Sequence, residues 1–482
     1  MQVIKKNTEL AELDGWVRRI WDVATGFGLD PYPTHFEVVP ASMMYEFGAY
    51  GLPGRFSHWT HGRDYYRMKT QYDYGLSTIY ELVINTDPCQ AFLMEANSLL
   101  ENKLVIAHVL AHCDFFRHNA LFAKTNRQMA ETAALHAERI REYAFKHGEL
   151  TVERFLDAVL SIEDHVESFA FPERPEPTDA EKRRAKEGRQ TPYDDLFAPV
   201  PGAPEPPNAT KRVPPEPQRD LLRFLAEHAE LEDWQRDVLM SVRAERLYFE
   251  PQMRTKILNE GWASYWHSRI LRALDLPSDE YADFARLHAG ILAPSRTSYN
   301  PYYLGMALLE HVEQRWETPS DKDKERLGLL GGQGREKLFA LRDLESDVSF
   351  VREYLTKDTV KDLDLYTYEY KDGQWVVTDK DWKRVRDTLV GQLTTYGTPY
   401  ITVEDGNHQN RRELLLKHHW DGNELDAEYA KRTLVHLHFL WKRPVSLVTR
   451  NAIGHIITWS YDGSVLNGTV TNPPAPEALL HV

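Results

Sequence analysis

Apolar residues recur every three or four positions through most of the first three quarters of the chain, which is the spacing of helices with one buried face. Residues 8–27 show it first, with Leu10, Leu13, Trp16 and Ile20 on one stripe. The same spacing predicts helices at about 94–122, 127–146, from 151 onward, and through most of 220–316. Residues 31–80 are crowded with aromatics, Gly and Pro, which predicts an irregular but packed segment. The pattern therefore indicates a mainly α protein.

Two stretches interrupt this helical pattern. Residues 171–218 combine repeated prolines with Glu, Lys and Arg, and such a stretch cannot bury enough apolar surface to offset the entropy lost on ordering. We therefore predict an exposed excursion at 171–218. The last quarter shows short β-rich runs around Asp372-Gly373 and Asp405-Gly406, each followed by a helical pattern, and then two further strands.

These patterns predict the domain organisation. We expect a large helical domain from residues 1–170 and 219–355, and a small C-terminal α/β domain at 360–470 with the order ββα-ββα-ββ. Residues 471–482 are predicted to form a flexible tail.

Composition narrows the class of function. The chain has 482 residues, with 58 basic and 73 acidic side chains and a formal charge of -15, which argues against nucleic acid as a partner. It has no apolar run long enough to span a membrane and no signal-peptide pattern. Cys89 and Cys113 are its two cysteines, which fits a reducing compartment. We expect a soluble, cytoplasmic protein that acts with protein partners.

The first candidate site is a pair of histidines inside an apolar helical stretch. His108 and His112 are one turn apart, so one helix would present both imidazoles to a single metal ion. Histidine pairs at this spacing are often incidental, and a lone histidine on an apolar face is more often a core residue. Glu101 and Asn119 fall on the same stripe and are candidate supporting residues.

The second candidate is an acidic residue on the apolar face of another predicted helix. Glu260 shares a stripe with Ile257, Ser264 and His267, and a buried carboxylate is costly unless it is paired or binds a cation. The alternative is a buried salt bridge to Arg127, Arg139 or Lys256. Gly261 weakens the helix and indicates close approach by another element.

Together the two segments make a ligand set. Two histidines and one glutamate form a three-ligand zinc site with an open fourth position. We therefore predict a divalent metal, zinc, bound by His108, His112 and Glu260, with Asn259, Ser264 and Tyr302 as neighbouring pocket residues.

The chain resembles the SpoVR (stage V sporulation protein R) family. The resemblance is carried by uncommon strings at 53–59 (PGRFSHW), 74–85 (YGLSTIYELVIN), 259–267 (NEGWASYWH), 300–305 (NPYYLG) and 440–445 (LWKRPV). The family is named for a role in forming the spore cortex, a peptidoglycan layer. Membership implies a link to cell-envelope synthesis, and a chain without an export signal would act there on precursors, their enzymes or regulators.

A more distant similarity is to the gluzincin metallopeptidases, in which an HExxH helix supplies two ligands and a later helix supplies a glutamate. It implies the same three ligands. However, Val109 stands where those enzymes have their general-base glutamate. The candidates to replace that base are the ionisable residues Asp114, Glu101, Glu245 and His267. We favour His267, with Asp114 as the second candidate catalytic residue.

Three functions follow from this site. The first is an atypical metal-dependent hydrolase without the HExxH base. The second is a non-catalytic, metallopeptidase-like scaffold that regulates envelope synthesis through protein partners. The third is an iron-binding helical protein in which Glu101, Asp114 or Glu138 joins the histidines, although the paired Glu-x-x-His motif of di-iron bundles is missing.

Overall fold

The computed structural model describes residues 2–73, 81–167, 212–294, 299–371, 374–395 and 397–471. The predicted excursion at 171–218 lies mostly outside these residues, and so does nearly all of the predicted tail at 471–482. The chain forms two compact units, one of residues 1–154 and 244–398 and the other of residues 155–243 and 399–482. The domain boundaries expected from the pattern, at 170, 219 and 355–360, stay a prediction.

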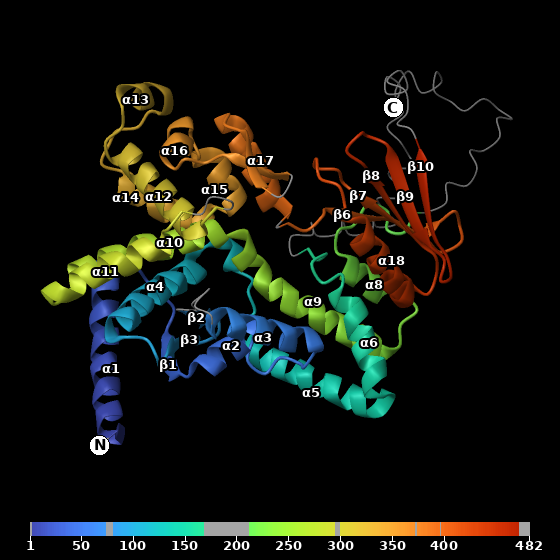
Figure 1. Ribbon diagram of the computed structural model, residues 1–482, viewed down its shortest axis with the longest axis horizontal. Helices are drawn as coiled ribbons and strands as arrows, with labels where there is room; N and C mark the ends of the chain where they lie inside the picture. Colours follow the sequence, from blue (N-terminus) through green and yellow to red (C-terminus); the bar gives the residue numbers. More distant parts are fainter. Residues whose placement is uncertain are drawn as a thin grey trace, which may run out of the picture. The chain divides into compact units, whose positions relative to one another are not determined.

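The first unit is mainly helical and carries a small sheet (Figure 1). Its elements before the second unit branches off are α1 (Gln2–Gly26), β1 (Thr34–Val39), α2 (Ala41–Tyr50), α3 (Trp59–Asp73), β2 (Leu82–Ile84), β3 (Cys89–Met94), α4 (Leu99–His118), η1 (Ala120–Phe122) and α5 (Met129–His147). The chain passes from one unit to the other within α6 (Glu149–Leu160) and returns within α9 (Asp233–Arg254). The remaining elements are α10 (Lys256–Ala273), α11 (Ser278–Ile291), α12 (Pro301–Glu317), α13 (Asp321–Leu327), α14 (Gly334–Leu344), α15 (Asp347–Tyr354), α16 (Lys357–Asp362), β4 (Thr367–Lys371), β5 (Gln374–Asp379) and α17 (Trp382–Thr395).

Helix α4 is the central helix of this unit. It begins at a capping box, in which the Ser98 side chain accepts from the Glu101 backbone and the Glu101 carboxylate accepts from the Ser98 backbone. Every residue from Asn102 to Phe116 is buried, because α4 packs against α1 on one side and α10 on another. Such all-round burial makes α4 the natural carrier of an interior site.

Helix α10 lies against α4 and α12, and its contact with α12 is a backbone contact. A Cβ atom added at Gly261 would lie 2.5 Å from the Cα of Gly305, so neither position has room for a side chain. The close approach predicted from Gly261 is therefore confirmed, with α12 as the approaching element. Figure 1 shows α4, α10 and α12 as neighbours in the first unit.

The segment expected to be irregular contains regular structure. Strand β1 pairs in parallel with β3, and β2 pairs antiparallel with β3, to give a sheet of order β1-β3-β2. Residues 31–80 themselves contain β1, α2 and α3, whereas β2 and β3 follow this segment. The frequent aromatics, Gly and Pro obscured its pattern, and β1 gains its pairing from β3, which lies later in the chain. Strand β3 leads directly into α4.

The second unit contains a five-stranded sheet of order β10-β9-β8-β7-β6. Its elements are α8 (Leu221–His228), β6 (Ile401–His408), β7 (Glu413–His418), α18 (Ala427–Trp441), β8 (Val445–Arg450), β9 (Ile456–Tyr461) and β10 (Leu466–Thr471). β7 and β8 are parallel because α18 crosses between them, and α18 packs on β8 and β9. The predicted fold class, mainly α with a small C-terminal sheet domain, is confirmed. The β4–β5 hairpin, however, forms a sheet of its own.

Two further features of the described residues bear on class. None of their helices combines the length and the apolar character needed to cross a bilayer. Cys89 and Cys113 are both buried and form no disulfide.

Candidate metal centre

Two histidines of α4 and two glutamates from elsewhere converge inside the first unit. His108 is 1% exposed and His112 is 4% exposed, and their ring centroids are 4.6 Å apart. Glu260 comes from α10 and is 6% exposed, while Glu81 lies just before β2. One ligand atom from each of these four residues lies within 4.8 Å of the others. The structure thus brings the three predicted ligands together and adds Glu81.

The distances show how these groups face one another. His108 Nε2 lies 3.1 Å from Glu81 Oε1 and 3.4 Å from Glu260 Oε2. His112 Nε2 lies 3.8 Å from Glu81 Oε1 and 3.4 Å from Glu260 Oε2. Both imidazoles therefore turn the same nitrogen toward the two carboxylates. A neutral imidazole coordinates through such a nitrogen.

The other nitrogen of each imidazole is held by a neighbouring side chain. His112 Nδ1 lies 2.8 Å from Asn259 Oδ1, which can only accept, so this nitrogen carries a hydrogen and donates. His108 Nδ1 lies 2.8 Å from His267 Nδ1, and His267 Nε2 lies 2.9 Å from His288 Nδ1. If His108 donates through Nδ1, neutral His267 accepts at Nδ1 and donates from Nε2 to His288. Such partners hold the rings of metal-binding histidines in position.

The charges of the site favour an ion. Burial lowers the pKa of His112, but hydrogen bonds and charge from Glu260 and Glu81 outweigh it and raise that pKa to about 10. Burial opposes the ionisation of Glu81, yet His108 and His112 lower its pKa to about 2. Burial and the neighbouring His108 and His288 depress the pKa of His267 well below its usual value, so this residue is neutral. The two ionised carboxylates thus hold a proton on His112, and a divalent cation would supply the positive charge in place of that proton.

Unpartnered atoms test whether the residues fit a metal ion. His108 Nε2 and Glu260 Oε2 are buried and face each other at 3.4 Å, but within the described residues neither atom makes a hydrogen bond of good geometry. Leaving buried polar atoms unpaired is costly, and a cation between them would satisfy both. Two imidazoles and a carboxylate are a common donor set for zinc, and imidazole with carboxylate also suits iron. The residues therefore fit a divalent metal.

A cavity of about 470 Å³ opens onto these four side chains. Its other lining residues are Leu82, Val83, Leu104, Phe116, Gln252, Lys256, Asn259, Ile291 and Tyr302. Lys256 forms an ion pair with Glu260 Oε1, and the Tyr302 ring lies 5.9 Å from the His108 ring. Burial and the charges of Glu260 and Glu81 raise the pKa of Tyr302 above its usual range, so its phenol keeps its proton. The pocket thus places the candidate metal ligands beside a protonated phenol and an apolar wall.

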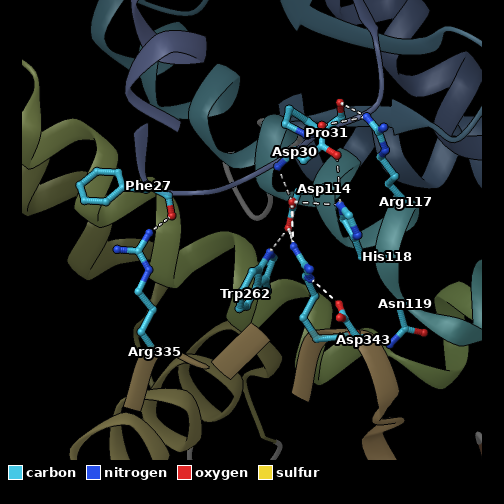
Figure 2. A network of polar contacts seen from close by, with 11 residues as sticks. Phe27, Asp30, Pro31, Asp114, Arg117, His118, Asn119, Trp262, Arg335 and Asp343 are labelled. Carbon is cyan, nitrogen blue, oxygen red and sulfur yellow. Dashed lines mark hydrogen bonds and ion pairs between the residues drawn. The ribbon is translucent and has the colours of Figure 1, made fainter. Parts of the chain in front are cut away.

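Asp114, a predicted catalytic residue, lies in a different network (Figure 2). Its carboxylate is fully buried, accepts from Arg342 at 2.9 Å and from Trp262 Nε1 at 3.0 Å, and also accepts from the Asp30 backbone. It does not line the 470 Å³ cavity. These contacts join α4, α10 and α14, so the role they indicate for Asp114 is to hold these helices together.

Three predicted supporting residues also lie away from the cavity lining. Glu101 caps the start of α4. Asn119 ends α4 and donates to the carbonyl groups of Arg342 and Glu345. Ser264 is fully buried on α10, and its hydroxyl has no hydrogen-bond partner among the described residues. Asn259 and Tyr302, by contrast, line the cavity beside the histidines.

His267 lies behind His108, on the side away from the two carboxylates. Its contact is with His108 Nδ1, and it does not line the cavity. The proton-transfer role expected for His267 stays a prediction. Its observed contacts are those of a residue that positions His108.

Glu81 is the site residue that the pattern analysis did not identify. It directly precedes a strand of three residues, so no helical stripe could have connected it with His108. β2 is brought beside β3 by the pairing of Leu82 with Phe92, and β3 leads into α4. One available signal was an acidic residue at the start of the apolar run Leu82-Val83-Ile84.

Comparison with known proteins covers nearly the whole chain. Residues 7–398 match the model of the SpoVR like protein family, and residues 399–452 match that of the SpoVR-like C-terminal domain. The boundary at 398/399 is also the last point at which the chain changes unit, although the first match includes residues 155–243 of the second unit. The chain is also 29% identical over 474 residues to the uncharacterized protein YcgB of Escherichia coli (strain K12), covering 92% of this chain and 93% of YcgB. No solved structure matches the chain. The matched regions show that the chain belongs to the SpoVR family.

Proposed function

We propose that this protein is a metal-dependent hydrolase that binds zinc through His108, His112 and Glu260. The observation that carries the proposal is the convergence of both His Nε2 atoms on two carboxylates at the end of a cavity. A bound divalent ion would act as a Lewis acid and activate water. Such activation is what hydrolysis of an amide or ester requires.

Glu81 supplies the carboxylate that Val109 does not. The general base of a hydrolase must be ionised at neutral pH and must lie within reach of the attacking water. The low pKa of Glu81 keeps it ionised. Its Oε1 lies 3.1 Å from His108 Nε2, so the carboxylate is beside the position where a substrate would approach the metal ligands. We assign Glu81 to accept the proton of the water, and His267 to hold His108 in position.

Tyr302 and the apolar wall account for the rest of the pocket. The protonated phenol of Tyr302 is suited to donate a hydrogen bond to an oxygen on which negative charge develops. Leu104, Phe116 and Ile291 provide apolar surface that limits the entry of water. The SpoVR name links the family to the cell envelope, and the protein is predicted to be cytoplasmic. We therefore propose a soluble precursor of the cell wall as the substrate class.

The observed position of Glu81 also favours a second candidate. If Glu81 is a fourth ligand, a tetrahedral zinc ion has four protein ligands and no open position, as in structural sites. The protein would then be a scaffold whose metal stabilises the fold. Iron or manganese, which accept more ligands, would remain open to substrate even with four protein groups.

One set of variants separates these candidates. Elemental analysis of the purified full chain identifies the metal, and His108→Ala should lose it. Glu81→Gln should keep the metal but lose hydrolysis, measured by mass spectrometry as the addition of one water to compounds of a soluble cell-wall precursor fraction. Loss of metal from Glu81→Gln, with no hydrolysis by the wild type, would establish the scaffold. A wild-type protein without metal, under conditions where zinc is supplied, would contradict both.

A further inference from the structure

A second and larger cavity of the first unit is lined by twice as many basic as acidic side chains. Its volume is about 740 Å³, and it lies among α12, α13, the end of α15, the start of α16, and α17. The basic lining residues are Arg315, Lys322, Arg326, Arg352, Lys357 and Arg386. None of the residues that line it also lines the 470 Å³ cavity beside His108 and His112, here called the metal pocket.

The charge of this lining is opposite to that of the protein. The six basic residues face three acidic ones, Asp323, Glu353 and Asp358, whereas the whole chain has 58 basic and 73 acidic residues. Solvent-exposed charges of one sign around a concave surface raise the local concentration of ligands of the other sign. The cavity is therefore a place where an acidic protein would attract an anion.

Several of these cations are available to a ligand. Arg315 is engaged by Asp323, at 3.0 Å from Nε to Oδ1, and Arg386 pairs with Asp387. Among the described residues, Lys322, Arg326, Arg352 and Lys357 form no ion pair, and all four are exposed. They come from α13, α15 and α16, so they surround the cavity from different elements.

The chemistry of these groups selects the ligand. Guanidinium groups match phosphate oxygens in paired hydrogen bonds, and lysine adds point charge. The four cations without an ion pair carry more positive charge than one phosphate, of about -2, would neutralise, whereas a ligand with two or more phosphates matches them. A cavity of this volume also suits a small molecule. We propose that this cavity binds a small ligand that carries at least two phosphate groups.

The half-buried ring of Trp382 borders the same cavity, with the Arg386 guanidinium 5.2 Å from its centroid. An aromatic face at the rim of a phosphate site can stack a planar group such as a nucleobase. Nucleotides and inorganic diphosphate share the phosphate chemistry. Only a nucleotide has a base that could stack on the ring of Trp382. A nucleotide should bind more tightly than pyrophosphate if the ring contributes.

The test is calorimetric titration of the full chain, at physiological ionic strength, with inorganic phosphate, pyrophosphate and ATP in turn. Pyrophosphate and ATP should bind at least ten times more tightly than inorganic phosphate. The double variant Arg326→Glu/Arg352→Glu changes two exposed residues of the lining and should weaken that binding at least tenfold.

The matched control is Lys324→Glu/Lys361→Glu. It makes the same change in net charge on exposed residues of α13 and α16 that do not line the cavity, and binding should stay within about twofold because salt screens distant charges. The proposal is overturned if none of the three anions binds, or if binding survives Arg326→Glu/Arg352→Glu, as it would at the metal pocket. Binding of an acidic peptide in place of all three phosphates would also overturn it, in favour of a protein partner.

Discussion

Gly261 of α10 and Gly305 of α12 touch backbone to backbone, one residue after Glu260 and three residues after Tyr302. A Cβ atom at either position would lie within 2.7 Å of a backbone atom of the other glycine, which real structures do not show. This contact fixes the distance between the two helices. It therefore sets where the Glu260 carboxylate and the Tyr302 phenol lie in the metal pocket.

Gly261→Ala should destabilise the protein by about 3 kcal/mol, because the clash is with backbone and cannot be relieved by turning a side chain. Chemical denaturation measures this change, and metal content should fall with it. Gly290→Ala is the matched control, since Gly290 is helical and an added Cβ would meet nothing within 4 Å. It should be neutral or slightly stabilising. Equal stability of the two variants would show that the helices can move apart.

Asn259→Ala should weaken zinc binding by about 10- to 100-fold while leaving the protein folded, because His112 loses the acceptor for its Nδ1 hydrogen. Competition with a chromogenic chelator measures the affinity. Ser264→Ala, on the same helix, removes a hydroxyl without a described hydrogen-bond partner and should leave the affinity unchanged. If both variants bind zinc like the wild type, Asn259 does not orient the ligand.

Zinc binding at pH 7 should release protons. In the metal-free protein the pKa of His112 is raised from 6.5 to about 10, with burial opposing and the two glutamates prevailing, so this imidazole is protonated at pH 7. Its contribution to stability is complete below pH 6.5 and is lost as the pH rises through about 10. Coordination needs the neutral ring, so affinity should rise with pH over this range. Calorimetry in buffers of different ionisation enthalpy counts the protons, and a count of zero would show that His112 is already neutral.

Arg342→Leu should cost about 3–5 kcal/mol, because it leaves the fully buried Asp114 carboxylate without its partner. The folded fraction should keep its metal, since Asp114 does not line the metal pocket. Asp343→Ala removes the other, exposed partner of Arg342 and should cost no more than about 1 kcal/mol. A stable Arg342→Leu protein without hydrolytic activity would instead support the catalytic role predicted for Asp114.

Helical periodicity was enough to predict that His108, His112 and Glu260 face the interior. His108 and His112 are one turn apart on α4, and Glu260 lies on the same face of α10 as Ile257, so each stripe pointed inward as a unit. What periodicity could not predict is how separate elements meet. Glu81 lies beside the histidines because β2 pairs with β3. His288 contacts His267 from a separate helix, α11, and the periodicity of one helix does not indicate which other helix packs against it.

The same limit applies to the fold. The alternating runs around Asp405-Gly406 predicted β6 and β7, because a hairpin is a local structure. Strand β10 was missed, since five of its six residues are exposed and its sequence lacks a buried alternation. Local patterns likewise suggested that the β4–β5 hairpin belonged with the later strands. Which sheet a strand joins depends on partner strands that are distant in sequence. Among the described residues, β4 and β5 pair only with each other.

The division of the chain has a consequence for how the centre is assembled during translation. Residues 155–243 belong to the second unit, and they lie between the helix that carries His108 and His112 and the helix that carries Glu260. The ribosome therefore releases both imidazoles and Glu81 well before the last carboxylate has been synthesised. A growing chain holds an incomplete set of donors throughout that interval, so a metal ion that needs all of them would bind only after α10 emerges and docks.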